Sequence, residues 1–181
     1  MTAAQFSLVV ATSADGFIAR HPGDSPTSWA SAEEQAIFFE HVDRADWSVM
    51  GRHTHEVADR PDRRRIVFST QTAGWQRPTQ LWLNPADNTP ASLAEHVNAV
   101  HPLEHALILG GTRVHDWFLA QNAIAAVYLT VEPIRFGTGL PLFSEHIGPP
   151  LEVLEALGFT MHANQTLNRQ GTRYITLKPW P

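Results

Sequence analysis

Glycine and arginine occur together at two points where an apolar segment meets a polar one. Residues 51–54 (GRHT) follow the apolar residues 47–50, and residues 110–113 (GGTR) follow the apolar residues 106–109. Glycine lets a ligand approach the backbone closely, free amides at a helix start attract anions, and a guanidinium can fork onto a phosphate. Both points therefore favour a phosphate-bearing ligand, although a plain turn and a solvated charge explain residues 51–54 equally well. Residues 69–71 (STQ) are a weaker third candidate.

A carboxylate on the apolar side of a predicted helix also indicates chemistry. Ser31 is a suitable N-cap for a helix over residues 32–44. On a helical projection, Glu34 and Gln35 both point into the arc formed by the apolar residues Ile37, Phe38, Phe39, Val42 and Ala45. Burial in an apolar pocket would raise the pKa of Glu34 and suit it to donate a proton beside a hydride acceptor. The alternative is that Glu34 bends out to water.

Several other reaction classes lack their usual residues. The chain has no cysteine, which excludes thiolate catalysis, disulfides and cysteine metal sites. Its 10 histidines are scattered without metal-ligand spacing, so we expect no metal. Neither a Walker A motif, a G-x-G-x-x-G after a strand, H-E-x-x-H nor G-x-S-x-G occurs. The formal net charge of −5 argues against nucleic-acid binding.

The hydropathy pattern predicts a mostly parallel α/β sheet that would position these residues. Short apolar segments predict strands at residues 6–11, 47–50, 66–69, 81–83, 106–109 and 125–131, and helices are predicted at 32–44, 92–100 and 113–121. Such alternation is typical of parallel sheets, whose ligands bind beyond the carboxyl ends of the strands. After an irregular segment at 133–143, residues 151–157, 161–167 and 172–178 are predicted to be strands. We expect an open sheet of about eight strands with flanking helices and an antiparallel C-terminal edge.

Length and composition predict one domain. The 181 residues suit a single folding unit over 1–181, and 43% hydrophobic with 17% charged residues is typical of a globular protein. The N-terminus shows no signal-peptide pattern, and no apolar segment approaches the roughly 18 residues that a membrane span needs. Together with the absence of cysteine, these features predict a cytoplasmic protein that binds neither membrane nor nucleic acid.

Four segments, in order, resemble the dihydrofolate reductase superfamily. VVATSADGFIA looks like the family's first strand and loop, SVMGRHTHE like its second-strand motif, RRRIVFSTQ like its third, and LILGGTRVHDWFLA with AVYLTVEP like its late Gly-Gly segment. The resemblance covers most of the chain. It implies a dihydrofolate reductase-like fold and an NADPH-dependent oxidoreductase acting on a small-molecule substrate.

The resemblance also implies which residues hold NADPH. Arg52, His53 and Thr54 correspond to residues that meet the phosphates, and Ser69 and Thr70 to residues at the adenosine end. Residues 110–114 correspond to the segment that passes the pyrophosphate and nicotinamide, and Trp29 would wall the nicotinamide pocket. The full set implied for the cofactor is Ala11, Gly16, Ile18, Trp29, Gly51, Arg52, His53, Thr54, Ser69, Thr70, Gly110, Gly111, Thr112, Arg113 and Val114.

Within the superfamily, GTGLPLF and SWASAEE are similar to the C-terminal reductase domain of bacterial bifunctional deaminase-reductases. That branch implies a homodimer and reduction of a pyrimidine intermediate of riboflavin biosynthesis, 5-amino-6-(5-phosphoribosylamino)uracil. Leu109 stands where those reductases usually carry glutamate, and an ungapped count places the folate enzymes' carboxylate on Gln35. Dihydrofolate reduction is therefore an alternative activity, and a nucleotide-binding assembly protein without turnover is another.

The expected catalytic residues are Glu34 and Asp15. Glu34 is the first candidate for the proton donor because helical geometry directs it inward. Asp15, a water molecule or the substrate itself would supply the proton if Glu34 does not.

Overall fold

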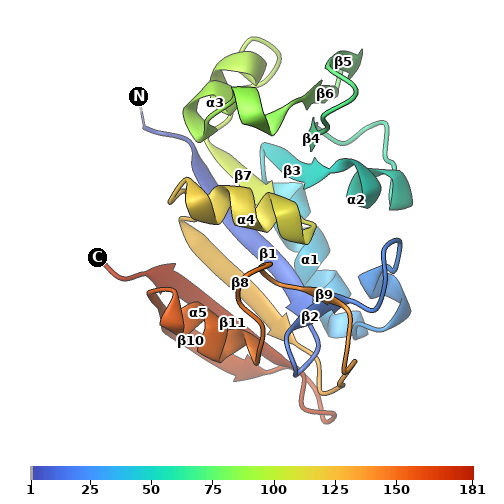
Figure 1. Cartoon of the computed structure of the whole chain (residues 1–181), viewed down its shortest axis with the longest axis vertical. Coiled ribbons are helices and arrows are strands. Elements are labelled where there is room, and N and C mark those ends of the chain that lie inside the picture. Colours follow the sequence, from blue (N-terminus) through green and yellow to red (C-terminus); the bar gives the residue numbers. More distant parts are fainter. Residues whose placement is uncertain (1) are drawn as a thin grey trace.

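A computed structural model describes residues 2–181 (Figure 1). The strands are β1 (Gln5–Thr12), β2 (Phe17–Ala19), β3 (Trp47–Gly51), β4 (Arg65–Phe68), β5 (Gly74–Arg77), β6 (Gln80–Leu83), β7 (His105–Ile108), β8 (Ala126–Val131), β9 (Leu140–Pro141), β10 (Phe159–Thr166) and β11 (Arg173–Pro179). The α-helices are α1 (Ala32–Arg44), α2 (Arg52–Val57), α3 (Pro90–Val97), α4 (Thr112–Ala120) and α5 (Pro150–Ala156). Short 3-10 turns occupy η1 (Pro26–Ser28) and η2 (Pro85–Asp87).

Nine strands form one mixed sheet in the order β10-β11-β8-β1-β7-β3-β4-β6-β5. The strands from β8 to β6 run parallel to their neighbours. At one edge β11 and β10 are antiparallel, and at the other edge β5 is antiparallel. Strands β2 and β9 form a separate pair. The mostly parallel sheet and its antiparallel C-terminal edge are therefore confirmed.

Helices cover both faces because the central strands are apolar on both sides. Figure 1 shows α4 and α5 in front of the sheet and α1 behind it. On the front face, Phe118 of α4 packs against Phe6 of β1 with ring centroids 5.0 Å apart. On the other face, His41 of α1 lies over Tyr128 of β8 at 4.4 Å. Ligands of such sheets bind at the carboxyl ends of the strands and in the loops that follow them.

The predicted strand at residues 151–157 is wrong, because the structure has the helix α5 at Pro150–Ala156. Leucines at 151, 154 and 157 share one helical face, whereas the alternation of Leu151 and Val153 with polar neighbours is typical of a strand. Pro150 favours the first helical turn, and Leu154 is fully buried. Packing of this leucine face against the core therefore decided between the two periodicities.

Several short elements were not predicted from the sequence. They include β2, β5 and β9, none longer than four residues. Segments of this length contain too few residues to show a period.

No helix within residues 2–181 is long and apolar enough to cross a membrane.

Candidate functional site

The candidate anion-binding residues follow three neighbouring strands. Gly110 follows β7, Gly51 ends β3, and Ser69 follows β4, and these strands are adjacent and parallel. The carboxyl ends of parallel strands lie at one edge of a sheet. The Gly51 amide donates a hydrogen bond of 2.8 Å to the Gly110 carbonyl, which joins two of these strand ends directly. Three junctions that are far apart in the sequence thus form one row.

The glycine pair leaves backbone groups and space at the start of α4. Gly110 has a φ of +97°, and the Gly110–Gly111 peptide is cis. Gly111 is the N-cap of α4 without a side-chain cap, and an added Cβ there would meet nothing within 4 Å. Within residues 2–181, the N–H groups of Thr112 and Arg113 have no hydrogen-bond partner. Such free amides at a helix N-terminus are able to bind an anion.

Two arginines lie at the starts of the helices that follow these glycines. Arg113 is exposed and forms no ion pair or side-chain hydrogen bond with residues 2–181. The Arg52 guanidinium lies 3.2 Å from His53 Nε2 and 4.0 Å from the Glu56 carboxylate. A cation in the first turn is unfavourable for the dipole of α4 unless an anion lies beside it. Arg113 therefore favours a negatively charged ligand.

The hydroxyl groups of two residues in the implied cofactor set form hydrogen bonds with the backbone of the protein itself. The Thr112 hydroxyl donates to the Pro141 carbonyl at 2.6 Å. The Ser69 hydroxyl accepts the amides of Gln71 and Thr72, each at 3.2 Å. Thr70, by contrast, is exposed. Thr112 is thus available to a ligand through its backbone, and Thr70 through its side chain.

Four further residues of the set lie within strands or helices. Ala11 is buried in β1, and Ile18 packs against the core. The half-buried Thr54 lies within α2. Val114 is buried at the start of α4, and its Cγ2 would lie 3.6 Å from a Cβ added at Gly51. A side chain at position 51 would therefore meet α4 at ordinary van der Waals distance.

Trp29 lies in the segment between η1 and α1. Its ring stands edge-on to Phe136 with centroids 5.2 Å apart, and its indole N–H is buried without a hydrogen-bond partner within residues 2–181. Buried donors in folded proteins nearly always find a partner. The orphaned N–H of Trp29 therefore marks a place where a ligand or an ordered water completes the structure.

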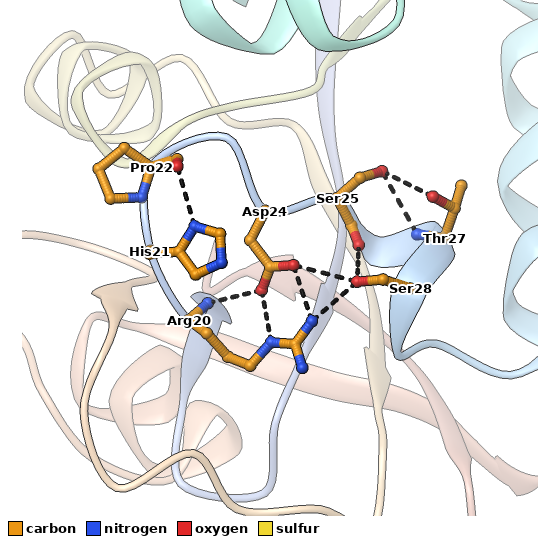
Figure 2. A network of polar contacts seen from close by, with 7 residues as sticks. All are labelled: Arg20, His21, Pro22, Asp24, Ser25, Thr27 and Ser28. Atoms are coloured by element: carbon orange, nitrogen blue, oxygen red, sulfur yellow. Dashed lines mark hydrogen bonds and ion pairs between the residues drawn. The ribbon is translucent and has the colours of Figure 1, made fainter.

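Figure 2 shows the polar network that shapes the loop leading to Trp29. The Arg20 guanidinium donates to both carboxylate oxygens of Asp24 at 2.8 and 2.9 Å, and also to the Ser28 hydroxyl at 2.9 Å. Ser28 in turn donates to Asp24 at 3.0 Å. Arg20 also lies over the Phe136 ring, 5.9 Å from its centroid. The loop is thus tied to the aromatic pair of Trp29 and Phe136.

Glu34 is a buried carboxyl at the start of α1. Only 6% of its surface is exposed, and its backbone N–H donates to the hydroxyl of the N-cap Ser31 at 3.2 Å. Burial, and secondly the nearby Glu132 carboxylate, raise the pKa of Glu34 to about 7. Gln35 is only half-buried, and its side-chain amide donates to the Ala30 carbonyl at 3.4 Å. The structure therefore places Glu34, rather than Gln35, inward.

Asp15 has a different environment from Glu34. Its carboxylate accepts hydrogen bonds from the Ser13 hydroxyl at 2.7 Å and from the amides of Phe136 and Gly137 at 3.1 and 2.8 Å. Burial acts to raise the pKa of Asp15, but these hydrogen bonds outweigh it and hold the pKa below the ordinary value. An ionised carboxylate of this kind is less suited than Glu34 to donate a proton.

Gly16 allows two backbone segments to touch. Its φ is +92°, and an added Cβ would lie 1.9 Å from the carbonyl oxygen of Gly148. Any side chain at position 16 would therefore push the loop after β1 away from the turn before α5. The structure gives Gly16 a packing role whether or not a cofactor also lies near it.

The sequence reasoning missed Glu132. This residue directly follows β8, is 4% exposed, and lies close enough to Glu34 to raise its pKa. The available signal was an acidic residue between a buried strand and Pro133. Burial of a carboxylate at such a place requires hydrogen-bond donors, and these come from distant parts of the chain.

Two surface hollows lie away from this row of residues. One hollow lies beside Asn122 and Trp180, and another beside His55 and Arg77, and Glu34 lines neither. Within residues 2–181, no three histidine, aspartate or glutamate side chains lie together as a metal site would require.

The open, mostly parallel sheet with helices on both faces places the chain in the α/β fold class. The candidate site lies at the carboxyl ends of the strands, where proteins of this class bind their ligands. Comparison with solved structures identifies the dihydrofolate reductase-like fold within that class. A protein from Shewanella sp. PV-4 assigned to riboflavin biosynthesis matches with a TM-score of 0.69 and 20% identity, over 97% of this chain and 98% of that chain.

Two further solved structures share the fold. A diaminohydroxyphosphoribosylaminopyrimidine deaminase/5-amino-6-(5-phosphoribosylamino)uracil reductase from Thermotoga maritima matches with a TM-score of 0.73 and 17% identity, over 97% of this chain and 56% of that chain. A dihydrofolate reductase from Enterococcus faecalis, complexed with NADP(H), matches with a TM-score of 0.66 and 19% identity, over 96% and 95%. No protein-family model and no curated protein matches the sequence. The predicted fold is thereby confirmed.

Proposed function

We propose that the protein is an oxidoreductase that binds NADPH and reduces a small heterocyclic or carbonyl substrate by hydride transfer. The arrangement of the strand ends carries the proposal. Anion-binding candidates follow β7, β3 and β4, and the buried acid Glu34 lies on the helix that packs on the adjoining strand β1. A hydride donor and a proton donor could therefore act on one substrate at this edge of the sheet.

The residues present fit a dinucleotide. The free amides of Thr112 and Arg113 and the guanidinium groups of Arg113 and Arg52 would hold the phosphates, and Thr70 would lie toward the adenosine end. Trp29 offers an aromatic wall with an unpartnered N–H. When bound, NADPH supplies the hydride. The protein supplies binding, orientation and the proton.

Glu34 is the proposed proton donor. Because its pKa is raised to about 7, roughly half of these side chains are protonated at neutral pH. Reduction of a C=N or C=O bond needs a proton on the heteroatom as hydride reaches carbon. Asp15 is the less favoured donor because three hydrogen bonds stabilise its ionised form.

The substrate is proposed to be a pyrimidine of the riboflavin pathway, with dihydrofolate as the alternative. The name of one solved neighbour includes the uracil reductase activity, and another neighbour is a dihydrofolate reductase. Nicotinamide absorbance followed with each substrate would separate these activities. A protein that binds NADPH but leaves every trace flat would be a nucleotide-binding assembly protein instead. Its lack of cysteine suits the proposed cytoplasmic location.

Replacing Arg113 with glutamine should weaken NADPH binding by about 10- to 100-fold, the usual loss for one charge-assisted hydrogen bond. The binding of NADH should weaken by a similar factor, because both dinucleotides carry the diphosphate. Quenching of tryptophan fluorescence would measure both affinities. Arg169→Gln, at an exposed arginine in the β10–β11 turn, is the matched control and should bind normally. Failure of the unaltered protein to bind either dinucleotide would refute the proposed function.

A homodimer is also proposed, and the edge strand β10 supports it. Residues 161–166 of β10 are exposed and carry no Asp, Glu, Lys, Arg or Pro, so their backbone groups are open to pairing. Sedimentation at micromolar concentration should show a dimer, and Asn164→Lys should shift it toward monomer. Val100→Lys, at an exposed residue outside this hairpin, should leave the dimer unchanged. A monomeric unaltered protein would exclude the proposal.

A further inference from the structure

Glu132 is a second buried carboxyl at the proposed site, and the reduction described above does not use it. It lies directly after β8 with 4% of its surface exposed. Its Oε1 accepts the backbone N–H of Ser31 at 2.7 Å, and its Oε2 accepts the Thr172 hydroxyl at 2.7 Å. Both oxygens therefore have a donor, one from the N-cap of α1 and one from the residue before β11.

The direction of the hydrogen bond from Thr172 is fixed by Asn168. The Asn168 Oδ1 accepts the amides of Gly171 and Thr172, each at 3.1 Å, so its Nδ2 is the atom that faces the Thr172 hydroxyl at 2.9 Å. The Thr172 oxygen accepts this bond, which leaves its own proton to point at Glu132. Glu132 thus sits at the end of a chain of donors.

Glu34 has no comparable support. Within residues 2–181, neither of its carboxyl oxygens accepts a hydrogen bond, and the hydrogen bond at this residue is made by its backbone N–H. Donors favour the ionised form of a carboxyl, whereas burial without donors favours the neutral form. Two neighbouring carboxyls with such different surroundings separate into one anion and one acid.

Charged groups on the surrounding elements do not alter this assignment. Glu33, next to Glu34 on α1, is exposed and accepts a 3.3 Å hydrogen bond from Asn168 Nδ2. The nearest basic residues along the adjoining segments have exposed side chains and pair with neither buried carboxyl: Arg135, Arg169 and Arg173. Asp15, at the end of the neighbouring β1 loop, is held by its own three hydrogen bonds.

We propose that Glu132 is a positioning residue, which carries the negative charge of the pair, keeps the proton on Glu34 and fixes the start of α1 against the ends of β8 and β11. The bond from the Ser31 backbone N–H to Glu132 joins the start of α1 to the end of β8, and the Ser31 hydroxyl also accepts the backbone N–H of Glu34. The use of this proton in reduction rests on the proposed function. The assignment of the proton itself concerns the free protein.

Carboxyl titration of the free full-length chain by NMR, with isotope-labelled glutamate, tests the assignment without cofactor or substrate. The unaltered protein should show one glutamate that titrates near pH 7, and this signal should vanish in Glu34→Gln. In Glu132→Gln the midpoint should fall by about one pH unit, because a nearby negative charge is removed. The control Glu40→Gln, at an exposed carboxylate further along α1, should leave the midpoint in place.

Two results would overturn the proposal. A near-neutral titration that persists in Glu34→Gln would put the proton on Glu132, and this arm decides even if Glu132→Gln does not fold. An unchanged midpoint in a folded Glu132→Gln protein would show that the charge of Glu132 does not act on Glu34. If the unaltered protein does not bind NADPH, the proposed function is refuted, but the titration result is unaffected.

Discussion

Replacement of Glu34 by glutamine is expected to lower turnover by about 10²- to 10⁴-fold, the range that one positioned general acid contributes. Glutamine keeps the size of the side chain but has no acidic proton to give. In the unaltered enzyme, turnover should fall as the pH rises above about 7, because the protonated form of Glu34 is then lost. In Glu34→Gln, that fall should be absent. Turnover against pH, measured with NADPH and the accepted substrate, provides the test.

The NADPH dissociation constant of Glu34→Gln should stay within about twofold, because the proposed phosphate contacts come from the β7, β3 and β4 ends. Glu40→Gln removes an exposed carboxylate from a later position of α1 and should retain full turnover. If Glu34→Gln has the same pH profile as the unaltered enzyme, the proton donor is water, Asp15 or the substrate instead of Glu34. The folate-like mechanism would then be abandoned.

Replacement of Gly16 by alanine should lower the free energy of unfolding by at least about 3 kcal/mol, because it combines a strained backbone with a steric clash. The φ of Gly16 is +92°, and the new Cβ would lie 1.9 Å from the Gly148 carbonyl oxygen. A backbone atom cannot move aside as a flexible side chain can. For a chain of this length the loss corresponds to a fall in Tm of roughly 6–12 °C, which thermal unfolding would detect.

Gly74→Ala separates the two causes. Gly74 has a φ of +98°, close to that of Gly16, but an added Cβ would meet nothing within 4 Å. The free energy of unfolding of Gly74→Ala should therefore fall only by the cost of backbone strain, about 1–2 kcal/mol. Equal losses in the two variants would mean that the approach of Gly16 to Gly148 is not tight in solution. A greater loss at Gly16 would confirm that glycine is needed there for packing.

The amino-acid sequence by itself determined the parts of the fold that depend on local patterns. Short apolar segments predicted the central strands, and the strand–helix alternation predicted the parallel sheet. Ser31 and the first turn after it predicted α1 with Glu34 on the inner side. Each of these signals lies within about 15 neighbouring residues, which is the distance over which propensity, capping and periodicity act.

Local pattern failed where two periodicities fit the same residues or where a segment was short. Residues 151–157 satisfy a strand and a helix equally well, and only the burial of Leu154 selects the helix. The choice between Glu34 and Gln35 was likewise left open by the sequence. The burial of Glu34 and the contact of Gln35 with Ala30 decided it in the structure.

Only the tertiary structure decided how the candidate site is assembled. Glu132 accepts one hydrogen bond from a residue 101 positions away and another from a residue 40 positions away. The row formed by Gly51, Ser69 and Gly110 likewise depends on the strand order β7-β3-β4. Pairing between distant segments is fixed by which apolar faces bury each other across the whole sheet, and no local window of the sequence contains that information. The sequence therefore indicated which residues could form the site. Folding decided which of them lie together, including the buried carboxyl group of Glu132 beside Glu34.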